Sequence, residues 1–142
     1  MFGAGEDAWH ACNRGGAAAQ LKRGVRAVTN AAPGLDAPWP TAERGRARFA
    51  EALRNAGDDD ALVDALLAVL ADGEKVALSP TRMPPEVKDR LCHICVPPVS
   101  VGDGKFWGTR THTVFLVRAD GRGAAVERGL DGGVWSDVRE SF

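Results

Sequence analysis

Hydrophobic and polar residues alternate most regularly in the last third of the chain. Residues 106–117 place threonine, valine and aromatic side chains with a two-residue period, which is typical of a strand with one buried face. Asp120-Gly121 favours a tight turn, and residues 124–128 form a second strand-like run, so together they predict an antiparallel hairpin. Residues 134–142 predict a last strand with its tryptophan packed inward.

The middle of the chain changes to a helical period. Residues 42–56 predict a helix that begins after Thr41, a candidate N-cap, and ends at Gly57. A second helix is predicted to begin at residues 58–60, because three consecutive aspartates suit the positive end of a helix dipole. Leucine and valine residues then form an apolar stripe, and this helix is predicted to end at Gly73.

The remaining segments predict shorter strands and loops. Residues 7–13 and 22–29 predict a pair of strands, and residues 91–96 predict a buried strand. Residues 30–39 and 97–105 are rich in glycine and proline, so they predict loops. Strands that cluster around a helical pair indicate an α+β fold with mostly antiparallel sheets.

Composition narrows the classes of function. The chain of 142 residues has the length of one domain, so we expect residues 1–142 to form a single unit. The net charge of −1 predicts no attraction to nucleic acid or to an anionic membrane surface. Its longest apolar run is far shorter than the ~20 residues that span a bilayer, so no integral membrane segment is expected. Residues 1–7 lack the features of a secretory signal, and with three cysteines this predicts a reducing, cytoplasmic location.

Three segments resemble one known family. They are VTNA at residues 28–31, LDAPWP at residues 35–40 and GTRTHTVFLV at residues 108–117. In this order, with a helical region between them, they resemble the Transport and Golgi organisation protein 2 family. That family is also called NRDE, after an Asn-Arg-Asp-Glu motif in its N-terminal half. The resemblance covers residues 9–142 and concerns only the C-terminal half of the family.

The resemblance carries expectations about fold and role. It implies an αββα sandwich like that of N-terminal nucleophile hydrolases, of which this chain would supply a partial, C-terminal half. It also implies a role in Golgi and endoplasmic-reticulum organisation, in protein secretion, or in the handling of intracellular haem and lipid, with Golgi or mitochondrial association. Haem is then expected as a cargo and not as a resident cofactor. The expected partners are a second copy of the chain, an N-terminal half-domain or a small-molecule ligand.

The residues that the family would need for covalent chemistry do not match. In the family a cysteine at the second position becomes the N-terminal nucleophile, whereas here Met1 is followed by Phe2. The Asn-Arg-Asp-Glu motif is also missing, and Asn13-Arg14 shares only two letters with it. We therefore expect a truncated, non-catalytic relative that binds without turnover. The alternative is half of an N-terminal nucleophile amidohydrolase that another polypeptide completes.

Asn30 and Arg110 are the candidate pocket residues. Asn30 is either a turn residue before Pro33 or an amide donor that lines a pocket. The resemblance supports the second alternative, because an Asn at this place often helps to form the oxyanion hole of N-terminal nucleophile hydrolases. Arg110 either forms a structural ion pair with Asp103 or Glu127, or faces an anionic ligand such as a carboxylate or phosphate.

Cys92, His93 and Cys95 form a Cys-x-x-Cys segment that has two interpretations. Residues three apart on a strand face opposite sides, which favours packing of both thiols in a core. The alternative is a small metal or redox module that uses Cys92 and Cys95, with His10 and Cys12 completing the ligands. His93 is in addition a candidate haem ligand.

Two further features predict solvated surface. His112 is a second candidate haem ligand, but on its strand it is expected to face solvent. Arg44, Arg46 and Arg48 lie at alternate positions of the first predicted helix, where they are expected to form a solvated basic patch.

Overall fold

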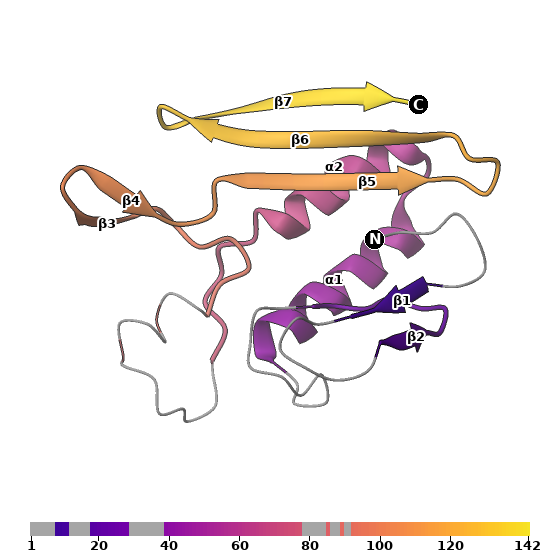
Figure 1. Ribbon diagram of the computed structural model, residues 1–142, viewed down its shortest axis with the longest axis horizontal. Helices are drawn as coiled ribbons and strands as arrows, with labels where there is room; N and C mark the ends of the chain where they lie inside the picture. The colour runs from indigo at the N-terminus through magenta and orange to yellow at the C-terminus, as the bar shows by residue number, and fades with distance from the viewer. Residues whose placement is uncertain (1–7, 12–17, 29–38, 78–84, 86–88, 90–91) are drawn as a thin grey trace.

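The computed structural model has an α+β fold, as the sequence predicts. It describes residues 8–11, 18–28, 39–77, 85, 89 and 92–142. The helices and strands follow the order β1 (Ala8–His10), β2 (Ala19–Leu21), α1 (Pro40–Asn55), α2 (Asp59–Leu70), β3 (Val99–Gly102), β4 (Lys105–Trp107), β5 (Thr111–Val117), β6 (Gly123–Asp131) and β7 (Val134–Ser141). The described strands form three antiparallel sheets, ordered β1–β2, β3–β4 and β5–β6–β7 (Figure 1).

The three-stranded sheet confirms the predicted C-terminal hairpin and last strand. β5 pairs with β6 in a register that puts Val114 opposite Val126, and both side chains are buried. β6 then pairs with β7 across a two-residue turn, Gly132-Gly133. Both glycines have positive φ, at 54° and 86°, which is the backbone that two-residue hairpin turns require.

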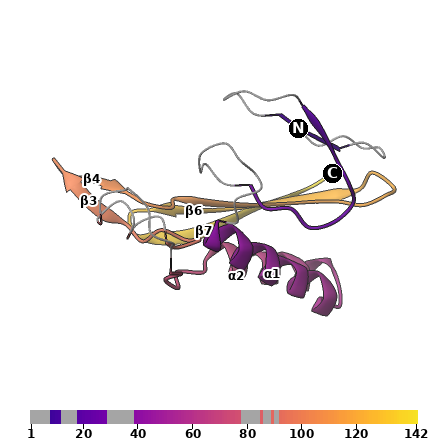
Figure 2. The same cartoon turned by 90° about the horizontal axis from the view of Figure 1, so that it is seen from below.

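The two helices cover one face of this sheet, and β1–β2 lies on the other side of it (Figure 2). The core lies between the helices and the sheet. It consists of Ala52, Val63, Leu66, Leu67, Val114 and Val126. Asp58 caps α2, because its carboxylate accepts a hydrogen bond from the Ala61 backbone N–H at 2.8 Å, so the predicted aspartate start is confirmed.

A buried carboxylate ties the two helices together just after α2. The side chain of Asp72 is only 2% exposed, and its carboxylate accepts hydrogen bonds from Arg44, with Nε at 2.6 Å, and from Arg48. Burial opposes ionisation of this carboxyl, but the hydrogen bonds outweigh it and lower its pKa from 3.8 to about 2. Arg44 and Arg48 share a helix face because they are four residues apart. The prediction of a solvated basic patch is therefore wrong for these two, while Arg46 pairs with Glu43 on the surface.

The first helix begins one residue earlier than its predicted N-cap. Thr41 lies inside α1 and is buried, while Trp39 occupies the N-cap position without a capping side-chain hydrogen bond. Pro40 in the first turn explains the difference, because proline has no N–H to satisfy and its fixed φ suits a helix start.

The predicted strand that spans residues 106–117 is interrupted. β4 ends at Trp107 and β5 begins at Thr111. The loop predicted at residues 97–105 contains β3 instead, which pairs with β4 across a turn in which Asp103 has φ of 51°. Asp103-Gly104 is a sequence that favours a hairpin turn, and this signal for the β3–β4 hairpin was missed.

Two other predicted strands do not form as expected. The partner of β1 is β2, and residues 22–28 contain no strand; Gly24, at φ of 139°, interrupts the alternating pattern there. Residues 92–96 form a turn and a bend in place of the strand predicted at residues 91–96, of which residue 91 lies outside the described residues. Cys95 donates its N–H to the Asp72 carbonyl at 2.8 Å, and the Cys92 carbonyl accepts from the Val76 N–H at 2.8 Å.

Candidate functional site

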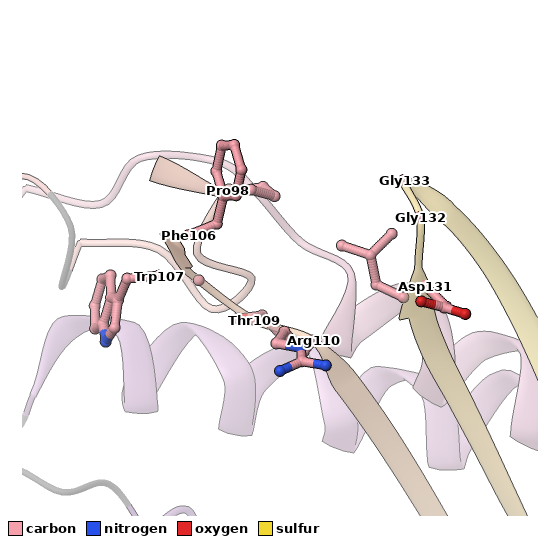
Figure 3. A pocket seen from close by; sticks show the side chains of 10 residues that line it. Pro98, Phe106, Trp107, Thr109, Arg110, Asp131, Gly132 and Gly133 are labelled. Atoms are coloured by element: carbon pink, nitrogen blue, oxygen red, sulfur yellow. The ribbon is translucent and has the colours of Figure 1, made fainter. Parts of the chain in front are cut away.

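Arg110 lies at the point where the chain enters β5. Its backbone carbonyl accepts a hydrogen bond from the Leu130 N–H at 2.8 Å, which joins the start of β5 to the end of β6. Arg110 itself precedes the strand, so it is not inside it as the sequence suggested. This position brings its side chain to the end of the sheet, beside the β6–β7 turn and the β3–β4 hairpin (Figure 3).

A cavity of about 520 Å³ opens at this end of the sheet, and Arg110 lines it. Its walls come from the β3–β4 hairpin, the segment before β5, and the turn between β6 and β7. The lining residues are Pro98, Phe106, Trp107, Gly108, Thr109, Arg110, Leu130, Asp131, Gly132 and Gly133. A space of this volume fits a small organic molecule, and apolar walls with few charged groups are typical of ligand pockets.

The segment before β5 is held closely against the residues that follow the cysteines. Thr109 donates its N–H to the Val96 carbonyl at 2.9 Å, and its hydroxyl accepts from the Val96 N–H at 2.9 Å. A Cβ at Gly108 would lie 3.0 Å from the Pro97 carbonyl oxygen and 3.0 Å from the Pro98 Cα. A side chain at this position would push the neighbouring backbone back by a few tenths of an ångström, so glycine favours the close approach that sets one wall of the cavity.

Two charged side chains, Arg110 and Asp131, line the cavity, and both are exposed to solvent. Within the described residues, neither Arg110 nor Asp131 makes an ion pair or a side-chain hydrogen bond. The ion pair considered between Arg110 and Asp103 or Glu127 does not form. The alternative, in which Arg110 faces a pocket, agrees with its place in the cavity wall.

Asn30, the other pocket residue that the sequence suggested, lies outside the described residues. The structure therefore brings together only one of the two candidates. The sequence did not single out Asp131 or the aromatic pair Phe106 and Trp107, although the Asp-Gly-Gly turn and the adjacent aromatics were visible signals.

The Cys-x-x-Cys segment does not form a cation site within the described part of the chain. Cys92 is buried and its thiol donates to the Asp89 carbonyl at 2.7 Å, with His93 Nδ1 at 3.4 Å. Both described cysteines are free, and burial raises the pKa of the Cys95 thiol, which opposes thiolate chemistry. No group of three or more possible metal ligands occurs among the described residues, and Cys12 lies outside them. His93 does not line the cavity.

His112 is buried, so its predicted exposure to solvent is wrong. Only 4% of the residue is exposed, and its ring stacks on Trp135 with a centroid separation of 4.8 Å. Neither ring nitrogen has a hydrogen-bond partner among the described residues. Trp135, predicted to pack inward, covers this ring while remaining partly exposed.

The fold and the cavity define an α+β protein with a ligand-sized pocket at the end of an antiparallel sheet. The model of one protein family, Transport and Golgi organisation 2, matches residues 2–132 of the 142. The chain therefore belongs to the Transport and Golgi organisation 2 family. A comparison with curated proteins found no match. No helix among the described residues is long and apolar enough to cross a membrane.

Proposed function

We propose that the chain is a non-catalytic binding member of its family, which holds an anionic small molecule in the cavity at Arg110. Binding would serve the transport and organisation roles expected from the resemblance: Golgi and endoplasmic-reticulum organisation, secretion, or haem and lipid handling. The observation that carries the proposal is a guanidinium without an ion-pair partner among the described residues, on the wall of a ligand-sized cavity.

The cavity offers a suitable group to each end of such a ligand: a guanidinium to the anionic end and apolar side chains to the rest. A guanidinium offers five N–H donors and binds a carboxylate or phosphate through two parallel hydrogen bonds. Phe106 and Leu130 offer apolar surface to the rest of the molecule. Haem, the cargo suggested by the resemblance, has carboxylates for Arg110, but the lining contains no histidine, cysteine or methionine as an axial ligand. Haem would therefore be carried through its propionates and not ligated.

The test compares three probes that share one phenyl ring. Isothermal titration calorimetry would measure binding of 3-phenylpropanoate, 2-phenylethyl phosphate and the uncharged 3-phenylpropan-1-ol. At least one anion should bind about fivefold more tightly than the alcohol, because Arg110 is exposed and an exposed ion pair contributes up to about 1 kcal/mol. Arg110→Met should remove this difference.

Arg54→Met is the matched control, since Arg54 is an exposed arginine in the last turn of α1, away from the cavity. It should leave the affinities unchanged. Equal binding of the alcohol and both anions, or equal losses in the two variants, would contradict the proposal.

A further inference from the structure

The cavity contains two opposite charges that do not neutralise each other. Arg110 and Asp131 both line it, and no ion pair joins them or links either to another described residue. The neighbouring charges behave differently. Arg128 and Asp137, next to each other on β6 and β7, form a two-point ion pair with both distances at 2.7 Å. Arg110 and Asp131 make no such pair, and among the described residues neither do Glu127 on β6 and Glu140 on β7; what distinguishes Arg110 and Asp131 is that both line the cavity.

The backbone explains why these two residues share one wall. The hydrogen bond between the Leu130 N–H and the Arg110 carbonyl fixes Arg110 beside Leu130, and Asp131 follows directly. Gly132 and Gly133 then turn the chain into β7, and a Cβ on either would meet nothing within 4 Å, so the turn leaves open space. In Figure 3, Arg110 lies at the start of β5 and Asp131 beside Gly132 and Gly133, while Pro98 and Phe106 lie toward the other side of the cavity.

We propose that the cavity binds a dipolar small molecule, one that carries a carboxylate and an ammonium group on an apolar or aromatic body, as an amino acid does. This inference rests on the proposed function and specifies its ligand. Arg110 would bind the carboxylate, Asp131 the ammonium group, and the apolar wall the remaining body.

Electrostatics favours a dipolar ligand over a simple anion. A bare carboxylate attracted by Arg110 is also repelled by Asp131, and a phosphate with two charges is repelled more. A molecule with one charge of each sign gains from both residues. The site therefore selects against ligands of a single charge. Asp131 repels simple anions and Arg110 repels simple cations, while a dipolar ligand is attracted by both residues.

The test uses calorimetric titration of the whole chain with L-phenylalanine, 3-phenylpropanoate and 2-phenylethylamine, which share the ring but differ in charge. L-Phenylalanine should bind about fivefold more tightly than 3-phenylpropanoate, since a partly exposed ion pair contributes up to about 1 kcal/mol. Asp131→Asn should abolish that preference and retain or strengthen the binding of 3-phenylpropanoate. Arg110→Met should weaken both acids.

Asp103→Asn is the control, because Asp103 lies in the β3–β4 turn outside the cavity lining and asparagine tolerates its positive φ. It should keep the preference for L-phenylalanine. If 3-phenylpropanoate binds through Arg110 and L-phenylalanine binds no more tightly, the proposal of a dipolar ligand is wrong and the proposed anion site stands. If neither acid binds in an Arg110-dependent way, the dipolar ligand is ruled out, and the proposed anion site also fails unless 2-phenylethyl phosphate binds through Arg110.

Discussion

His112 is a buried base inside the helix-covered face of the sheet, and its position makes stability depend on pH. Burial lowers the pKa of its ring from 6.5, and the positive charge of Arg128 acts in the same direction. The folded state therefore holds the ring neutral at a pH where the unfolded chain already binds a proton. Stability is complete above pH 6.5 and is lost as the pH falls through that value, until the folded ring also becomes protonated.

His112→Phe should flatten this dependence. Phenylalanine keeps a flat ring against Trp135 and has no titrating group, so urea midpoints should fall less between about pH 7.5 and about pH 5 than in the parent chain. His10→Phe, on β1, is the control and should keep the parent slope. An unchanged slope in His112→Phe would show that His112 does not cause the acid sensitivity.

At the scale of residues, the sequence predicted which side chains share a face but not which face is covered. The period of two groups His112, Val114 and Leu116 on one side of β5, and it groups Phe115 and Val117 on the other. Both sides contain apolar residues, so the pattern cannot decide. Packing of α2 against β5 made the choice and buried His112. Arg110 was a candidate because an arginine beside a strand start either pairs with a carboxylate at the sheet end or faces a pocket, and the sequence left both alternatives open.

At the scale of elements, the ion network around Asp72 joins α1 to the segment after α2. Its pKa of about 2 lies below the ordinary 3.8, so the ionised carboxylate contributes stability above pH 3.8 that is lost as the pH falls toward 2. Asp72→Asn should lower the free energy of unfolding by about 2 kcal/mol at neutral pH, the typical value of hydrogen bonds to a charged group. Urea denaturation checks this.

Asp103→Asn again supplies the comparison, because that exposed aspartate sits in a turn and has no part in the network. A loss in Asp72→Asn no larger than in this control would mean that the network does not secure the helices.

The helices and the long hairpin were predictable because local rules determine them. Asp58 caps α2, a repeating apolar stripe extends it, and two glycine-containing turns limit β6. The short strands were not predictable from the same rules. β2 and β3 depend on which neighbour supplies hydrogen bonds, and residues 92–96 bond to loops in place of a strand.

At the scale of the molecule, the sheet face opposite the helices carries exposed apolar residues. Phe115, Val117, Val138 and Phe142 are all more than half exposed, and the rings of Phe115 and Phe142 lie 5.6 Å apart. Exposed apolar patches of this kind promote association. We predict that two copies of the chain associate through this face, in a concentration-dependent manner that sedimentation velocity would detect.

Val138→Glu should shift that equilibrium toward the monomer, because a glutamate opposite Glu127 of β6 would bring an unpaired charge to the contact. The control is Ser136→Glu, two residues earlier on the same face of β7, outside the apolar cluster. A chain that stays monomeric at every concentration would rule out this interface.

The resemblance predicted the family, the order of predicted strands and helices predicted the α+β class, and both are confirmed. The αββα sandwich, the extent of the domain and the location in the cell stay predictions. An αββα sandwich needs a second large sheet, and among the described strands only the pairs β1–β2 and β3–β4 accompany the three-stranded sheet.

The central claim is that the Arg110 cavity binds an anionic group. An NMR titration tests this binding most directly. Titration of the ¹⁵N-labelled chain with 3-phenylpropanoate should move the Arg110 Nε–H signal and the backbone signals of Gly108, Gly132 and Gly133, all of which line the cavity. Arg110→Met should remove these shifts. Shifts confined to other parts of the chain, or the same cavity shifts in Arg110→Met, would contradict the claim.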